Sequence, residues 1–185
     1  IMEIAERRGL MVIEDAAQGV MARYRGRHLG GIGHLATLSF HETKNVTCGE
    51  GGALLVNQSL RELQAEIIWE KGTNRSQYFR GEIDKYTWVD LGSSYLPSEI
   101  NAAFLWAQLQ NAESISERRM EIWDRYHVGF ADLDHEDKLR RPIIPAECGH
   151  NAHMYYLLLP DVMCRDALLA HLNAFGVNAI FHFIP

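Results

Sequence analysis

Three short apolar runs in the first third of the chain limit what it can fold into. They are LMVIED (10–15), LATLSF (35–40) and GALLVN (52–57), and polar or glycine-rich residues separate them. Runs of this length between turn residues are typical of buried strands. Apolar residues at helical spacing occupy 1–8, before the first run, and Gly9 ends them. An amphipathic helix is predicted after the third run, over LRELQAEIIWEKG (60–72), with Gly72 as its stop. Strands that alternate with helices predict an α/β fold with a mostly parallel sheet.

The second half of the chain predicts a long helical region and a smaller domain. Helical spacing begins at Pro97 and predicts two helices that meet near Asn111. HMYYLLLP, a helix over 165–175 and VNAIFHFIP then predict a β-α-β arrangement. We therefore expect residues 1–110 to form part of a large α/β domain. Residues 111–185 would form the long helix and the beginning of a small α+β domain.

Composition narrows the classes of function. The net charge of -6 argues against a general nucleic-acid binder, because neutralising phosphates requires a basic surface. No apolar run reaches the roughly 18–20 residues that span a bilayer, and the N-terminus lacks a signal-peptide pattern. The cysteines Cys48, Cys148 and Cys164 are odd in number and scattered, which is typical of a reducing compartment. We expect a soluble, cytoplasmic protein that binds neither nucleic acid nor membranes.

Three chemically different side chains converge at the predicted carboxyl edge of the sheet, where ligands of open α/β sheets bind. Asp15 ends the first apolar run, Ser39 lies at the end of the second, and Lys44 follows in a loop before GEGG. Lys44 is one of only four lysines. An isolated lysine near a carboxylate in a glycine-lined rim suits Schiff-base chemistry. Asp15 suits a pyridinium nitrogen, and Ser39 suits a phosphate group.

Simpler interpretations of these and neighbouring residues stay open. A loop lysine such as Lys44 is usually solvated, and Glu14-Asp15 at a strand end is typical of a helix N-cap. GGIGHL resembles a nucleotide loop but lacks the GxGxxG order. His150 and His153 have a ligand-like spacing without cysteines or a second pair, so the sequence predicts no metal site. A nicotinamide oxidoreductase rests on the α/β pattern alone, and a fold does not establish a function.

The segments VIEDAAQ and SFHETKNVTCGEGG resemble the DegT-type sugar aminotransferases, which are fold-type-I pyridoxal-phosphate enzymes. The spacings from Asp15 and from Ser39 to Lys44 fit that family. The similarity continues through EKGTNRSQYFRGEIDKYTWVDLGSSYLPSEINAAFLWAQL, HMYYLLL and FHFIP, and so covers nearly the whole chain. It implies a mostly parallel sheet flanked by helices, with a smaller α+β C-terminal piece. A lysine at position 44 points to amino transfer, because relatives that are dehydratases carry histidine there.

This resemblance implies a role for each candidate residue. Lys44 would bind pyridoxal phosphate covalently and then move protons, and Asp15 would pair with the pyridine nitrogen. Gln18 would lie against the ring or its phenolic oxygen, and Ser39 would bind the phosphate. The implied substrates are glutamate, as amino donor, and a nucleotide-linked 4-keto-6-deoxy sugar. The implied assembly is a homodimer.

The chain also departs from the family pattern. GSSY, at 92–95, stands where many relatives have GxNxR, so the resemblance assigns no phosphate contact to Ser94. Tyr78 and His182 are candidate substrate contacts because of the motifs around them. Relatives extend beyond both ends of the chain, so we expect an internal fragment of such an enzyme. The alternative to an active aminotransferase is therefore a non-catalytic piece that packs against a partner chain.

Overall fold

The computed structural model describes residues 1–181, which form two compact units. The first unit comprises Ile1–Arg119 and Pro145–His153, and the second comprises Met120–Ile144 and the residues from Met154 onward. The domain division predicted at residues 110 and 111 concerns the domains of a whole enzyme and stays a prediction. His182, one of the predicted substrate contacts, lies outside the described residues.

The first unit contains two small sheets and several helices. Its strands are β1 (Ile13–Asp15), β2 (Arg23–Tyr24), β3 (Arg27–His28), β4 (Leu35–Ser39), β5 (Gly52–Val56) and β6 (Cys148–Gly149). Its helical elements are α1 (Met2–Arg8), the short 3-10 helix η1 (Ser59–Arg61), α2 (Glu62–Trp69), α3 (Arg75–Phe79), α4 (Glu99–Gln110) and the beginning of α5 (Ala112–Gly129).

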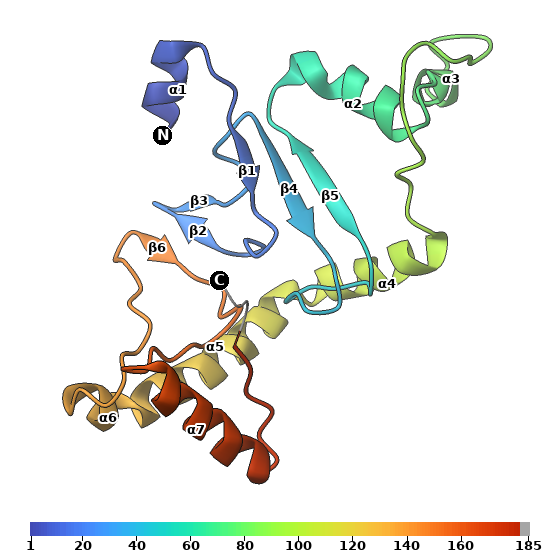
Figure 1. Ribbon diagram of the computed structural model, residues 1–185. Coiled ribbons are helices and arrows are strands. Elements are labelled where there is room, and N and C mark those ends of the chain that lie inside the picture. The colour runs from blue at the N-terminus through green and yellow to red at the C-terminus, as the bar shows by residue number, and fades with distance from the viewer. Residues whose placement is uncertain (182–185) are drawn as a thin grey trace. The chain divides into compact units, whose positions relative to one another are not determined.

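The three apolar runs form one sheet in the order β1-β4-β5, with β4 in the middle (Figure 1). β1 and β4 are parallel, with Asp15 opposite Thr37. β5 runs antiparallel to β4, with Gly52 opposite Ser39. The connection from β4 to β5, residues 40–51, contains no helix, and a parallel neighbour requires a longer crossover. The carboxyl ends of β1 and β4 therefore meet at one edge, where the candidate site lies.

The glycine- and arginine-rich segment RYRGRH (23–28) forms the β2-β3 hairpin. Its two loop residues, Arg25 and Gly26, both have positive φ angles (49° and 76°), which match the twist of a tight two-residue hairpin. β6 adds to the hairpin in antiparallel fashion, with Gly149 opposite Arg23. This pairing brings Pro145–His153 into the first unit although the chain on either side belongs to the second.

The helix boundaries follow the local signals closely. α1 ends at Gly9, which adopts the left-handed conformation (φ 63°), as predicted. α2 ends at Trp69, slightly before the predicted stop. The chain still turns at Gly72, which has a positive φ angle of 78°. Only glycine fits there, because a Cβ at this position would overlap the Asp90 carbonyl group. α4 and α5 meet at Asn111, which confirms the predicted junction.

The strands differ from the predictions in two respects. The first strand is shorter than the run 10–15, and Ile13 is 63% exposed, so it is not the buried strand that was expected. The cause is its position at the edge of the described sheet, where one side has no neighbour.

The predicted C-terminal β-α-β arrangement is also wrong within the described residues. Burial alternates along 154–160 as in a strand, but the only backbone pairing described there is the bridge between Leu158 and Arg140. No strand forms in 177–181 either. A strand requires a hydrogen-bonded neighbour, and apolar alternation alone does not supply one. The second unit thus contains the end of α5, α6 (Ala131–His135) and α7 (Val162–Ala174).

Candidate active site

The loop that carries Lys44 is fixed at both ends by backbone hydrogen bonds. Phe40 donates its N–H to the Gly51 carbonyl (2.8 Å), and its own carbonyl accepts from Cys48 N–H (2.9 Å). Val46 is fully buried in the core cluster that also contains Phe40 and Cys48. The side chain of Lys44 is therefore held close to a rigid base, as a precise reactive group requires.

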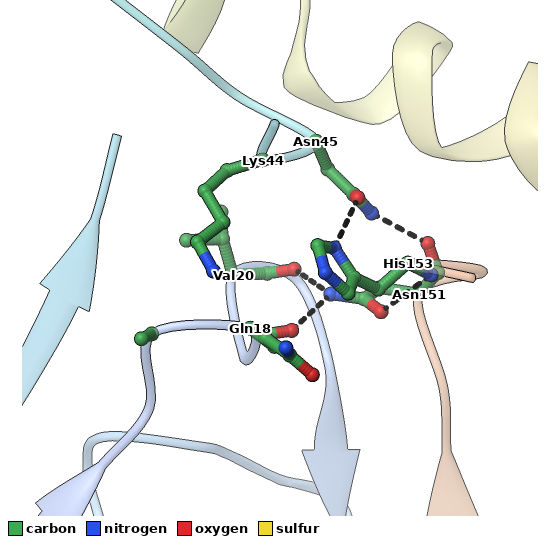
Figure 2. A pocket seen from close by; sticks show the side chains of 7 residues that line it. Gln18, Val20, Lys44, Asn45, Asn151 and His153 are labelled. Atoms are coloured by element: carbon green, nitrogen blue, oxygen red, sulfur yellow. Dashed lines mark hydrogen bonds between the residues drawn. The ribbon is translucent and has the colours of Figure 1, made fainter. Parts of the chain in front are cut away.

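Lys44 lines a pocket at the carboxyl edge of β1 and β4 (Figure 2). Two of the four predicted site residues, Lys44 and Gln18, come together there. We call this site the lysine pocket, and it is lined by Ala17, Gln18, Val20, Lys44, Asn45, Asn151 and His153. The space between these residues is small (about 150 Å³, open solvent included), so they do not enclose a small molecule by themselves.

Three residues that the sequence did not assign to the site form a hydrogen-bonded network beside Lys44 (Figure 2). The Asn45 amide Nδ2 donates to the Asn151 carbonyl (2.7 Å), and its Oδ1 lies 3.1 Å from His153 Nδ1. Asn45 and Asn151 are each only 6% exposed. Buried amides of this kind are costly unless their donors and acceptors are satisfied, as they are here.

The electrostatic surroundings of His153 favour its neutral form. Burial lowers its pKa below the ordinary value of 6.5, and the positive charges of Lys44 and Arg119 lower it further. Since Asn45 Oδ1 accepts, Nδ1 of the neutral ring carries the proton. Arg119 also donates to the carbonyl oxygens of Ala152 (3.2 Å) and His153 (2.7 Å), which fixes this segment against α5.

Asp15 and Ser39 end the neighbouring strands β1 and β4, as predicted, but neither lines the lysine pocket. One oxygen of Asp15 accepts from Ala17 N–H (3.1 Å), and within residues 1–181 the other has no hydrogen-bond partner. The N–H of His41 approaches the Ser39 oxygen at 3.4 Å, so the hydroxyl proton of Ser39 stays available for donation. The helix expected by the N-cap alternative does not form, because turns occupy 17–21.

The loop GGIGHL wraps around the side chain of Glu14 and binds its carboxylate. This carboxylate accepts from the N–H groups of Gly30 (3.0 Å), Ile32 (2.6 Å) and Gly33 (2.5 Å). We call this arrangement the Glu14 cradle. Burial opposes ionisation of Glu14, but these donors together with the charge of Arg27 outweigh it and lower its pKa below 4.5. The loop thus binds an anion from its own chain, and these three donors are not available to a nucleotide phosphate.

Gly30 is required for this cradle. Its φ angle is 89°, and a Cβ there would lie 2.7 Å from Leu55 Cδ1. Glycine avoids both the backbone strain and the overlap.

The remaining candidates lie elsewhere in the first unit. Tyr78, on α3, packs against Phe79 and Tyr86 at ring distances of 5.7 and 5.8 Å. Ser94 forms a backbone bridge with Glu70. Neither lines the lysine pocket. Among the described residues there is no group of three or more metal-binding side chains, and His153 Nδ1 is directed to Asn45.

The groups at this edge fit pyridoxal phosphate chemically. A cofactor with an aldehyde, a basic ring nitrogen and a phosphate requires an amine, a carboxylate and hydrogen-bond donors. Lys44 supplies an amine that makes no ion pair within residues 1–181, Asp15 supplies a carboxylate oxygen without a partner, and Ser39 supplies a hydroxyl proton. The residues present therefore match the cofactor that the sequence predicts.

Comparison with known proteins identifies the family. A model of the DegT/DnrJ/EryC1/StrS aminotransferase family matches residues 1–185. The chain belongs to this family. As in the resemblance predicted from its motifs, the match covers the chain from end to end.

Solved structures of aminotransferases share the fold. The TlmJ aminotransferase of Streptoalloteichus hindustanus is 26% identical, with a TM-score of 0.84 over 99% of this chain and 47% of its own. DesV of S. venezuelae, in complex with a ketimine intermediate, is 29% identical, with a TM-score of 0.83 over 100% and 46%. The PLP-form of the putative sugar aminotransferase Spr1654 from Streptococcus pneumoniae is 22% identical, with a TM-score of 0.78 over 94% and 44%.

These matches confirm the predicted α/β, fold-type-I architecture. The chain spans less than half the length of each of these three structures. Within residues 1–181, no helix combines the length and the apolar character that crossing a membrane requires.

Proposed function

We propose that this chain carries the catalytic lysine of a pyridoxal-phosphate-dependent sugar-nucleotide aminotransferase. The observation that carries the proposal is the lysine pocket, in which Lys44 and Gln18 face one site at the carboxyl edge of β1 and β4. Membership of the aminotransferase family supports the proposal. So do the ketimine complex of DesV and the PLP-form of Spr1654.

Each residue then has a chemical task. When bound, pyridoxal phosphate supplies an aldehyde that bonds amines and a ring that accepts electrons from the adjacent carbon. Lys44 Nζ would hold the cofactor through that aldehyde. With its amine free, Lys44 would be the base that takes the proton from the donor carbon. The same amine would return a proton to the product in the second half of the reaction.

The other three residues would hold the cofactor. The Asp15 carboxylate would keep a proton on the ring nitrogen, because a negative charge beside it favours the protonated form. The Ser39 hydroxyl would donate to the phosphate, and Gln18 would contact the ring or its phenolic oxygen. The position of Asp15 and Ser39 on adjacent parallel strands supports these assignments.

We propose glutamate as the amino donor and a dTDP-linked 4-keto-6-deoxy sugar as the acceptor. The product would be dTDP-4-amino-4,6-dideoxygalactose, the amino sugar nucleotide of enterobacterial common antigen synthesis. The segments HETKN and KGTNRSQYFRG, which resemble the transaminase of that pathway, support this choice. Incubation with glutamate and the keto sugar nucleotide, followed by NMR of the product, would locate the new amine. An amine at a carbon other than C4 would contradict the assignment.

We also propose that the enzyme is a cytoplasmic homodimer. α4 supports a partner, since Ile100 and Phe104, one helical turn apart on the same side, are 82% and 54% exposed. Apolar side chains exposed together usually mark an interface. Sedimentation of the full-length protein tests the assembly, and a monomer at micromolar concentration would contradict it.

The experiment that tests the function is covalent trapping. The purified protein is mixed with pyridoxal phosphate, its absorption spectrum is recorded, and borohydride reduction is followed by mass spectrometry of the peptides. We expect a new absorption band and a label on Lys44. A label spread over all four lysines would contradict the proposal. Labelling of the full-length protein but not of these 185 residues would favour the alternative, a piece that is inactive without its partner segments.

A further inference from the structure

One buried residue, Asn151, joins the two sides of the lysine pocket through its side chain and its backbone carbonyl. The Asn151 amide Nδ2 donates to the carbonyl oxygens of Gln18 (2.8 Å) and Val20 (2.7 Å), and so holds the turn on which Gln18 lies. The backbone carbonyl of the same residue accepts from Asn45 Nδ2 (2.7 Å), and Asn45 is the neighbour of Lys44. Figure 2 shows these contacts meeting at Asn151.

The remaining polar atom of Asn151 is also used. Its Oδ1 accepts from the N–H of His153 (3.1 Å), which closes a turn of the same segment. The side chain therefore has both donor hydrogens and its acceptor engaged, and the residue is 6% exposed. No other side chain of similar size restores this arrangement, because two donors must face two carbonyl groups while an acceptor faces an N–H.

We infer that Asn151 is a positioning residue, which sets the separation between the amine of Lys44 and the side chain of Gln18. The inference rests on the proposed function, since it concerns how those two groups meet the cofactor. Asn151 acts through the Gln18 turn on one side and through Asn45 on the other. Without the side-chain amide, the Gln18 turn is no longer tied to residue 151, while Asn45 can still donate to the backbone carbonyl of that residue. The pocket then keeps its residues, but the turn and the loop lose their fixed spacing.

A second asparagine in the same unit offers a matched control. Asn57 Nδ2 also donates to two carbonyl oxygens, those of Gly30 (2.8 Å) and Gly33 (3.0 Å). These contacts hold the loop of the Glu14 cradle, and Asn57 does not line the lysine pocket. Removing either amide breaks two donated hydrogen bonds of the same type, at one site beside the pocket and at one site away from it. Asn151→Ala also loses the contact of Oδ1 with His153 N–H.

The test compares Asn151→Ala with Asn57→Ala in the full-length protein. Three quantities are measured for each: the thermal unfolding midpoint, the dissociation constant for pyridoxal phosphate, and the pH midpoint of the absorbance of the Lys44–cofactor bond. The last two report on the geometry around Lys44, and a general loss of stability does not move that pH midpoint.

For Asn151→Ala we expect the dissociation constant for the cofactor to rise about tenfold. We also expect the pH midpoint to shift by roughly one unit, which corresponds to a tenfold change in the equilibrium between the protonated and deprotonated forms. The rate of amine transfer should fall about 100-fold, as expected for a displacement near 1 Å. Asn57→Ala should lower the unfolding midpoint but leave both cofactor measurements within twofold of the unsubstituted protein. If Asn151→Ala does not fold, Asn45→Ala breaks the same link from its other end, with the same expected results.

The inference is overturned if Asn151→Ala, or Asn45→Ala in its place, matches Asn57→Ala in cofactor affinity and in pH midpoint. Failure of the proposed function gives a different result: the unsubstituted protein then shows no label on Lys44, and the inference falls with it. If the unsubstituted protein is labelled and the variants behave alike, only the positioning role is wrong.

Discussion

The Glu14 cradle and the lysine pocket both lie next to β1, yet they use their charges in opposite ways. In the cradle, the carboxylate of Glu14 is surrounded by three backbone N–H groups. In the pocket, Lys44 makes no ion pair among residues 1–181, and the other polar side chains that line it are uncharged amides and an imidazole. A charge that is fully satisfied within the chain stabilises the fold, whereas a charge left without a partner can serve a ligand.

The contrast extends to neighbouring carboxylates on one strand. Glu14 and Asp15 are adjacent, so their side chains point to opposite faces of β1. Glu14 turns into the glycine loop, and one oxygen of Asp15 has no hydrogen-bond partner in the part of the chain that the structure describes. Sequence proximity therefore says little about role, and the two acids are expected to respond differently to substitution.

The largest expected effect is the loss of chemistry on replacing Lys44. Lys44→Ala should lower the rate of amine transfer by about 10³-fold or more, because no other amine lines the pocket among the described residues. Its free energy of unfolding should change by less than about 1 kcal/mol, since no ion pair is lost. Steady-state kinetics and urea unfolding of the same preparation measure both. A variant with normal turnover would remove Lys44 from the mechanism.

The Glu14 cradle should show the reverse pattern. Glu14→Ala leaves three N–H groups without their acceptor and should lower the free energy of unfolding by about 3 kcal/mol. Covalent labelling of Lys44 should persist in the folded fraction. Glu14→Gln, which keeps one carbonyl acceptor, is the matched control and should lose less. Equal stability of all three proteins would show that the cradle does not stabilise the fold.

The pH dependence of stability also tests the role of the Glu14 cradle. The pKa of Glu14 is lowered in the folded protein, so its contribution to stability is fully present above 4.5 and is lost as the pH falls through the folded pKa. As the pH is lowered from 5, the free energy of unfolding should therefore fall more for the unsubstituted protein than for Glu14→Gln. Urea midpoints at several pH values measure this difference. Parallel curves for the two proteins would contradict the assignment.

A smaller pH effect is expected from the pocket. The pKa of His153 is lowered in the folded protein, so the unfolded chain binds the proton more readily and stability falls as the pH drops below 6.5. His153→Gln keeps a donor towards Asn45 but cannot be protonated. The variant should lose less stability than the unsubstituted protein between pH 7.5 and 5.5, as measured by thermal unfolding. An equal loss would mean that His153 does not titrate in this range.

The features that sequence reasoning predicted correctly depend on nearby residues. Gly9 ends α1 and Asn111 separates α4 from α5, because capping and helical spacing act over one or two turns. The same holds for Asp15 and Ser39 at the ends of β1 and β4, since a short apolar run shows where its strand stops.

The features that sequence reasoning missed depend on residues far away in the chain. Asn151 bonds the Gln18 carbonyl, 133 positions earlier in the chain, and accepts from Asn45, 106 positions earlier. A local sequence pattern does not predict contacts over such separations. The spacing of His153 from His150 suggests only a metal ligand, so the sequence does not indicate its contact with Asn45. The alternation in HMYYLLLP predicts a strand, although a strand also depends on a partner that lies elsewhere in the chain.

The late position of Asn151 has a consequence for synthesis of the protein. Contacts across more than 100 residues close slowly, because a long chain segment must first be brought back to its partner. A nascent chain that has left the ribosome only as far as residue 144 already contains Lys44 and Gln18, but not the segment Pro145–His153. The sheet and the lysine loop are thus made first, and the lysine pocket is completed only after the chain returns.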